Sequence, residues 1–259
     1  MPTATVNYHV HRDERQAFHI DADGVKGRII WPELAAASVS VNDVRDLDRP
    51  LTLAADSIEF RQVPTSVEDF ENGTDWQADY NRELTALLTD KVDAQEVVVF
   101  DHTVRIDDPK SKRPPARNVH SDYSSSGAHQ RLRDLLGEDK AREWSQGHYG
   151  FINIWRPVEQ PINRTPLGFV RTQSTAEDDW LLLDLIYPDR TGQILGLVEN
   201  RSHEWIYQSL MTPDDVALFN IYDNKGLPSI AHSALDMVED ASVDSIRKSV
   251  ESRTLVRYA

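Results

Sequence analysis

Cysteine is absent from the 259 residues of the chain, and this excludes several classes of site at once. Without thiols the protein has no disulfide, no iron–sulfur cluster and no cysteine nucleophile. Any metal must therefore be bound by histidine and carboxylate side chains. Basic charge is scarce too, since 28 Lys and Arg residues stand against 43 Asp and Glu residues and the net charge is -15. A surface that binds nucleic acid needs a basic stripe, so we expect no nucleic-acid partner.

Long apolar runs are also missing. No segment is long enough to cross a bilayer, and residues 1–21 contain no apolar stretch of secretory length. We therefore expect a cytoplasmic protein with no membrane partner. The length allows one large domain with a substantial core, and we predict a single domain over residues 1–259.

The apolar pattern of the chain changes near its middle. Residues 75–91 and 128–144 place leucines and aromatic residues at helical spacing, with Gly137 as a possible interruption of the second helix. From Tyr149 onward, short apolar runs are separated by Pro, Gly, Asn and Asp, which is typical of an antiparallel sandwich or barrel. The expected strands cover residues 97–100, 151–155, 167–172, 180–186, 193–198, 204–210, 217–221 and 250–258.

This pattern predicts a mainly β fold with flanking helices. The core is expected to be a double-stranded β-helix, the jelly roll of cupin-like proteins. In this interpretation residues 1–100 form a supporting region of helix and strand, and residues 101–259 form the jelly-roll core with the metal site. The segment around residues 11–21 precedes any convincing strand and is expected to be mobile or at an edge.

Histidine and aspartate two positions apart provide candidate metal ligands. Side chains alternate along an extended chain, so two such residues point the same way. His120 and Asp122 follow a proline-bearing loop, residues 107–117, and stand directly before the β-rich half. We therefore predict that this pair binds a metal, although a hydrogen-bonded surface histidine is the alternative for His120. The chain has three such pairs: His11/Asp13, His19/Asp21 and His120/Asp122.

A third ligand in a jelly roll must come late in the chain, on a strand that returns beside the first pair. His129 lies on an expected outer helix and His203 follows an Asn-Arg-Ser turn, so we expect both to be solvated. His232 lies among apolar residues after a Leu-Pro turn and is the predicted ligand, with an ordinary core histidine as the alternative. Two histidines and one carboxylate occupy one face of an iron ion and leave three positions open.

Arg247 and Ser249 follow His232 in a segment with strand character. Two positions apart on a strand, a guanidinium and a hydroxyl face the same way and can bind one carboxylate together. A dicarboxylate co-substrate would need such a site. A solvated arginine on an edge strand is the alternative.

Five segments of the chain, taken in order, resemble the CmcJ/AsaB-like hydroxylase and desaturase family. The resemblance extends over roughly residues 50–258. Five ordered motifs are far more specific than one His-x-Asp pair. The segments are Val97–Arg105, Asn118–Ser124, Ile154–Pro157, Met211–Val216 with Phe219–Asp223, and Arg247–Glu251.

The resemblance implies the fold and chemistry of iron(II)/2-oxoglutarate oxygenases. His120 and Asp122 match the family's His-x-Asp, and His232 matches its late histidine. Arg247 and Ser249 match the Arg-x-Ser that binds 2-oxoglutarate in many such enzymes. An acidic stretch, residues 236–244, lengthens the gap before Arg247, and Arg156 is therefore a rival for the carboxylate.

The expected activity is a dioxygenase reaction that uses iron(II), 2-oxoglutarate and dioxygen. It would hydroxylate, desaturate or cyclise a small secondary-metabolite or amino-acid-derived substrate at an unactivated C–H bond, and Tyr123, Asn153 and His102 are candidate pocket residues. Two alternatives stay open: an iron oxidase that needs no 2-oxoglutarate, and a non-enzymatic jelly-roll binding protein. A zinc hydrolase is a third, weaker one. The substrate and the oligomeric state stay open as well.

Overall fold

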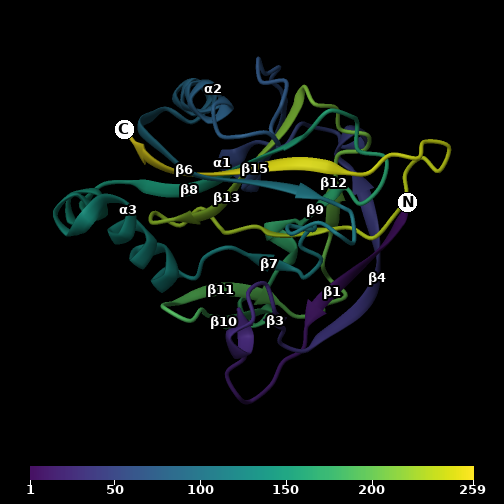
Figure 1. The fold of residues 1–259 in the computed structure, drawn as a ribbon, viewed down its shortest axis with the longest axis horizontal. Coiled ribbons are helices and arrows are strands. Elements are labelled where there is room, and N and C mark those ends of the chain that lie inside the picture. The colour runs from purple at the N-terminus through teal and green to yellow at the C-terminus, as the bar shows by residue number, and fades with distance from the viewer.

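The structure, a computed structural model, describes residues 1–259 as two facing β-sheets with helices outside them (Figure 1). The larger sheet has ten strands in the order β1 (Thr3–His9), β4 (Leu34–Asp43), β12 (Trp205–Tyr207), β9 (Leu167–Val170), β14 (Ala231–Ala234), β7 (His120–Ser121), β11 (Thr191–Leu197), β10 (Trp180–Ile186), β2 (Ala17–Ile20) and β3 (Ile29–Ile30). The smaller sheet has five, in the order β5 (Ile58–Gln62), β13 (Asp215–Asp223), β8 (Tyr149–Pro157), β15 (Lys248–Tyr258) and β6 (Ala94–Ile106). This arrangement confirms the predicted mainly β class with flanking helices.

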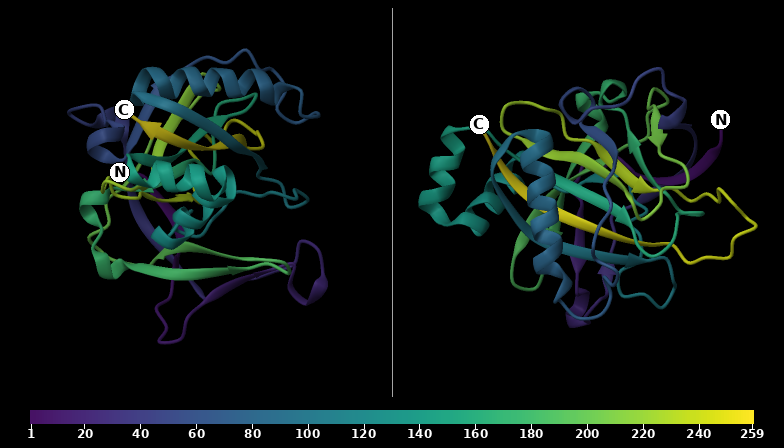
Figure 2. Two further views of the ribbon diagram at one scale, coloured as in Figure 1. Left: turned by 90° about the vertical axis from the view of Figure 1, so that its left-hand side faces the viewer. Right: turned by 90° about the horizontal axis from the view of Figure 1, so that it is seen from above.

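Three α-helices accompany the sheets: α1 (Leu53–Asp56), α2 (Trp76–Val92) and α3 (Ser125–Gln146). Helix α2 lies across the outer face of the smaller sheet (Figure 2) and buries Tyr80, Leu84 and Leu88 against it. Helix α3 is interrupted at Gly137, where φ is 75°, as the sequence suggests. No helix has both the length and the apolar character that a membrane span requires. Four short 3-10 helices, at Ala22–Gly24, Val44–Asp46, Thr172–Ser174 and Glu177–Asp179, lie in the connections.

Strand β8 is the central strand of the smaller sheet and is buried along its whole length. Its side chains alternate between two hydrophobic cores, one on each face of the sheet. Phe151 and Trp155 face the larger sheet, whereas Ile152 and Ile154 face helix α2. A strand covered on both faces is apolar at successive positions, so its sequence does not show which face lines a site.

The N-terminal part of the chain contributes strands to both sheets. Strand β1 pairs with β4 from Thr3 to His9, and β5 pairs with β13. Strand β3 ends the larger sheet, and β2, which lies within residues 11–21, is paired between β3 and β10 and is therefore next to the edge. None of these N-terminal strands was predicted, although β1, β2, β3 and β4 lie in the same sheet as β7 and β14, the strands of the predicted metal ligands.

Candidate metal centre

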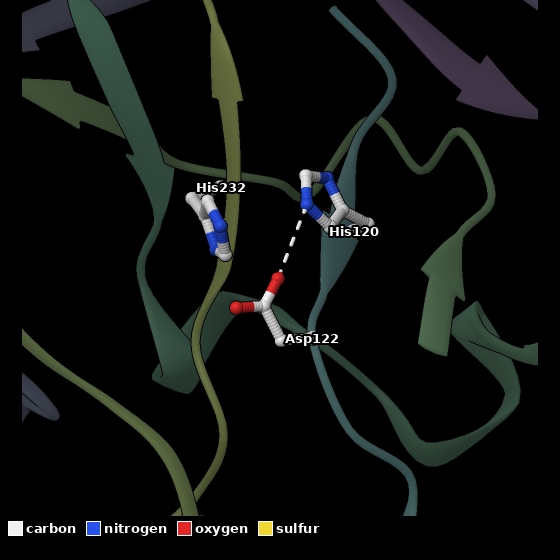
Figure 3. A group of neighbouring side chains, drawn as sticks. All are labelled: His120, Asp122 and His232. Carbon is white, nitrogen blue, oxygen red and sulfur yellow. Dashed lines mark ion pairs between the residues drawn. The ribbon is translucent and has the colours of Figure 1, made fainter. Parts of the chain in front are cut away.

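His120, Asp122 and His232 come together between the two sheets. Strands β7 and β14 are antiparallel neighbours that place His120 directly opposite His232, and Asp122 follows β7 immediately. The three side chains point toward one another (Figure 3), and one possible ligand atom from each lies within 4.8 Å of the others. This triad can bind a metal ion through two imidazoles and one carboxylate, a set that suits iron(II).

Hydrogen bonds to backbone carbonyls orient both imidazoles. His120 Nδ1 lies 2.8 Å from the carbonyl oxygen of Asn118 and donates to it, which leaves Nε2 free beside Asp122. His232 Nδ1 lies 3.4 Å from the carbonyl oxygen of Ile230. Burial, reinforced by the nearby His120, lowers the pKa of His232 to about 4, so His232 is neutral at pH 7 and its lone pair is available.

Glycine at position 196 allows a third histidine to pack behind the centre. Gly196 lies opposite His120 on β11, and a Cβ atom there would stand 2.6 Å from Cδ2 of His9. Burial lowers the pKa of His9 to about 4, with a further contribution from His120. His9 is therefore an uncharged neighbour that adds no positive charge to the site.

The two oxygens of Asp122 have different surroundings. Oδ2 accepts hydrogen bonds from Asn153 Nδ2 at 2.8 Å and from Arg253 Nε at 3.1 Å. Oδ1 is left facing His120, 3.5 Å from its Nε2. Burial opposes ionisation of Asp122, but the charge of Arg253 and the contact with His120 hold its pKa well below the usual range. The carboxylate is thus an anion that presents one oxygen to a metal.

Arg253 is the centre of a larger ion-pair network. In addition to Asp122, its guanidinium donates to Asp101 Oδ2 at 2.6 Å and to Glu251. All three partners are carboxylates, and the charge of Glu251 contributes most to raising the pKa of Arg253 against the opposing effect of burial. Arg253 was not among the predicted site residues.

A row of polar residues on and just before β15 explains how these groups meet. Arg247, Ser249, Glu251 and Arg253 are two positions apart, so they project from the same face toward the larger sheet. The two-residue spacing by which Arg247 and Ser249 were predicted continues through Glu251 and Arg253. This spacing was the sequence signal that could have identified those two residues. The spacing could not, however, predict that Arg253 contacts Asp122, which is distant in the sequence.

Arg247 and Ser249 are buried polar groups without partners. They are 3% and 0% exposed. No hydrogen bond within the protein involves Nε or Nη1 of Arg247 or Oγ of Ser249. Burial, with a contribution from Arg105, lowers the pKa of Arg247 to about 9, so it stays charged at pH 7. Its guanidinium lies 5.3 Å from the centre of the Trp155 ring.

The small cavity beside Arg247 reaches the metal triad. A guanidinium and a hydroxyl whose hydrogen-bonding groups are unsatisfied are suited to a carboxylate, because burying them without a partner costs free energy. The chemistry of these two residues therefore suits a carboxylate. The cavity is lined by Arg105, Ala116, His120, Trp155, Leu167, His232, Ala234, Arg247 and Glu251.

Arg156, the predicted rival, lies on the other side of the smaller sheet. It has the same parity on β8 as Ile152 and Ile154, so it points toward helix α2. Its Nε donates to the Tyr80 hydroxyl at 3.1 Å and its Nη1 donates to the carbonyl of Pro213 at 2.6 Å. The expectation that it competes for the carboxylate is corrected by this position, because Arg156 does not line the cavity and its Nε and Nη1 donate to other groups.

The other candidate residues divide between the site and the scaffold. Tyr123 lines the cleft described next, and Asn153 binds Asp122, whereas His102 packs near α2 and contacts Ser252. The expectation that His203 is solvated was wrong. Its side chain is 1% exposed and lies between Asp179 and the Tyr8 hydroxyl. His11 and His19 are exposed and outside the triad.

Asp122 also opens onto a much larger cleft, with a volume of about 1100 Å³. Its walls come from the first turns of α3, the β10–β11 hairpin and strand β6. The metal centre therefore lies between two cavities: the histidines border the small one and Asp122 borders the large one.

Comparison with known proteins agrees with this architecture. A family model described as an oxidoreductase/YMDC permease-like domain matches residues 6–257. The chain belongs to this family. The predicted kinship with hydroxylases and desaturases is confirmed by the curated relatives of this family member.

Two of these relatives match the chain over most of their length. The hydroxylase/desaturase efuI of Hormonema carpetanum is 29% identical over 248 residues, which covers 84% of this chain and 82% of the relative. The alpha-ketoglutarate-dependent dioxygenase tstK of Talaromyces stipitatus is 27% identical over 255 residues and covers 92% and 91%.

A solved structure has the same fold. The iron and alpha-ketoglutarate-dependent endoperoxidase NvfI superposes with a TM-score of 0.89 at 22% identity and covers 100% of this chain and 98% of that one. The likeness confirms the jelly-roll core that the sequence predicts. The prediction that the chain is an oxidoreductase is confirmed by the family and its relatives.

Proposed function

We propose that this family member is an iron(II)/2-oxoglutarate-dependent dioxygenase that oxidises an unactivated C–H bond of a small secondary-metabolite or amino-acid-derived molecule. The single observation that carries the proposal is that Arg247 lines one small cavity together with His120 and His232 of the triad, while Arg247 and the neighbouring Ser249 are both buried without hydrogen-bond partners. A metal site alone would fit several chemistries. A buried, unpartnered guanidinium and hydroxyl beside it favour a carboxylate-bearing co-substrate. The names of the relatives tstK and NvfI support the same co-substrate.

In this proposal His120, Asp122 and His232 hold iron(II), and Arg247 with Ser249 binds the distal carboxylate of 2-oxoglutarate. Iron(II) bound there, with 2-oxoglutarate and dioxygen, supplies the oxidising chemistry that removes a hydrogen atom from the substrate. Asp122 contributes one anionic oxygen, because its other oxygen is held by Asn153 and Arg253.

The remaining protein groups orient the reactants and restrict water. Trp155 packs beside the Arg247 guanidinium and covers one wall of the small cavity. Tyr123 follows Asp122 in the chain and lines the large cleft, so a substrate in the cleft would meet the metal from that side. The protein thereby places the C–H bond, and the geometry of that placement selects among hydroxylation, desaturation and cyclisation.

We also propose that this reaction takes place in the cytoplasm on a small-molecule substrate, without a nucleic-acid or membrane partner. The acidic composition and the size of the cleft support this proposal. Fractionation of cells that express the tagged protein tests the location.

The direct test of function uses protein loaded anaerobically with iron(II). Addition of 2-oxoglutarate is expected to produce a visible charge-transfer absorption band before oxygen is admitted, and succinate with coupled oxygen uptake afterwards. His120→Ala and Asp122→Ala should lose the bound iron and the band. His148→Ala is the matched control, because His148 is paired with Asp223 outside the triad.

The outcomes separate the proposed function from its alternatives. Oxygen uptake without succinate on any member of a substrate panel would favour an iron oxidase. Absence of iron binding in the unmodified protein would favour a binding protein, and turnover with zinc but not with iron would favour a hydrolase. Normal iron content in Asp122→Ala would remove Asp122 from the site.

A further inference from the structure

The arginines that form no ion pair are concentrated around the two cavities of this acidic protein. Most cationic side chains pair with the abundant carboxylates. Of the arginines that form no ion pair, most line one of the two cavities. Arg105 and Arg247 border the small cavity, and Arg113, Arg131 and Arg190 border the large cleft.

The large cleft is lined by arginine and contains no lysine. Two of its arginines are already neutralised: Arg15 pairs with Asp184, and Arg253 binds three carboxylates. The others keep their charge available to a ligand. A guanidinium, unlike an ammonium, offers parallel donors that match the two oxygens of a carboxylate or a related oxyanion.

Arg131 is the best placed of the free cations. It is half-buried on α3, whereas Arg113 and Arg190 are exposed. Its guanidinium lies over the Phe100 ring, 4.8 Å from the ring centre, and this cation–π contact stabilises the side chain in that position. Arg131 also lies close to Tyr123, the residue that follows the ligand Asp122. The free charge is therefore fixed on the metal side of the cleft.

Apolar side chains line the cleft beside this charge. Phe100 stands under Arg131, and Leu185 and Ile194 belong to the β10–β11 hairpin. Such walls favour the body of an apolar molecule, while the guanidinium selects its charged end.

We propose that the large cleft binds an amphiphilic anion, a small molecule with an apolar body and a carboxylate or similar oxyanion, and that Arg131 anchors the oxyanion. This proposal rests on the proposed function, because it takes the cleft as the substrate site of the dioxygenase. It adds the chemical class of the substrate, and it makes Arg131 a residue that determines specificity through substrate binding.

The test compares two fluorescent probes that share an aromatic body and differ in charge. The anionic probe is 8-anilinonaphthalene-1-sulfonate and the neutral one is N-phenyl-1-naphthylamine. Both are titrated into the full-length protein at low salt with saturating 2-oxoglutarate, which occupies Arg247. The unmodified protein is expected to bind the anion about tenfold or more tightly than the neutral probe, the gain typical of a charge-assisted contact.

Three variants locate the preference. Arg131→Gln should remove it, and Arg131→Lys should retain only part of it, because the forked geometry is lost. Arg142→Gln is the matched control: it makes the same charge change on α3, but Arg142 is exposed and lies outside the cleft. Circular dichroism melts confirm that each variant is folded. Added salt should reduce the preference in the unmodified protein.

Equal binding of both probes by the unmodified protein would overturn the proposal, as would an anion preference that survives in Arg131→Gln. These results leave the iron, succinate and oxygen measurements untouched, so they do not bear on the proposed function. Conversely, an Arg131-dependent preference in a protein that binds no iron would support the anion site while the dioxygenase assignment fails.

Discussion

Arg253 Nε lies 3.1 Å from Oδ2 of Asp122, so a half-buried cation binds the carboxylate of the metal triad on the oxygen that faces away from His120. A carboxylate bound in this way cannot use both oxygens on the metal without breaking the ion pair. Arg253 also offsets the charge of Asp101 and Glu251, which would otherwise repel an anionic co-substrate. One guanidinium thus orients a ligand and adjusts the local charge at the same time.

Replacement of Arg253 by glutamine is expected to weaken iron(II) binding by about ten- to a hundredfold, the range found when an outer-shell partner of a ligand is removed. Anaerobic equilibrium dialysis with iron(II) measures the affinity. Arg257→Gln is the control, because Arg257 lies on the same strand but pairs at the surface with Glu96 and Glu143. Equal iron affinity in the Arg253 and Arg257 variants would show that Asp122 needs no such support.

Asn153 binds the same oxygen of Asp122 as Arg253 does. Because the two donors share one acceptor, we expect Asn153→Ala and Arg253→Gln to be non-additive. The free energy of iron binding lost in the double variant should differ from the sum of the single losses by about 0.5 kcal/mol or more. The same dialysis measures this double-mutant cycle, and strict additivity would mean that the two contacts act independently.

Two buried arginines should respond in opposite directions to the same substitution. Arg247 has unsatisfied donors, so Arg247→Met is expected to stabilise the metal-free protein by about 1 kcal/mol or more, because an uncompensated buried charge is removed. Arg156→Met leaves the Tyr80 hydroxyl and the Pro213 carbonyl without their partner and should cost about 1–3 kcal/mol. Urea denaturation measures both changes.

The same two variants, at Arg247 and Arg156, are also expected to differ in the concentration of 2-oxoglutarate that they require. Arg247→Met should raise the 2-oxoglutarate concentration that half-saturates succinate formation by about tenfold or more, since a charge-assisted contact is lost. Arg156→Met should leave this concentration unchanged. The reverse pattern would place the co-substrate at Arg156.

The sequence predicted those features that depend on local spacing. The leucines of α2 follow the helical repeat, and the His-x-Asp pair needs only the alternation of an extended chain to bring His120 and Asp122 to one side. His232 was identified because the predicted fold required a late strand beside the first pair, and the register of β14 with β7 places it there.

Features that depend on long-range packing were not accessible in the same way. The hydrogen bonds of Arg156 depend on which face of β8 its side chain projects from. Both faces of that strand are apolar, so the sequence does not show which one Arg156 lies on. His203 follows a turn, yet it is buried through a contact with Tyr8, 195 positions earlier. Strand β4 is rich in alanine and serine and has only Val39 and Val41 as β-branched residues, a weak strand signal, although it pairs with β1 from Leu34 to Ser40.

The acidic stretch before Arg247 predicts a specific dependence of stability on pH. Burial raises the pKa of Glu239 to about 7, and the nearby Asp43 adds to the effect while the hydrogen bond from the Leu210 backbone N–H opposes it. Below pH 4.5 the folded and unfolded states both carry the proton. Between pH 4.5 and about 7 the unfolded chain ionises while the folded protein keeps the proton, so folding stability falls as pH rises.

Glu239→Gln is therefore expected to flatten this decline, whose slope from one group is at most about 1.4 kcal/mol per pH unit. Urea denaturation at intervals from pH 4.5 to pH 7.5 measures the slope. Asp240→Asn is the matched control: Ser242 hydrogen bonds lower the pKa of the adjacent Asp240, so its ionisation affects stability only at more acidic pH. A Glu239→Gln slope equal to that of the Asp240 variant would show that Glu239 is ionised in the folded protein, and the acidic stretch would then be a solvated surface segment.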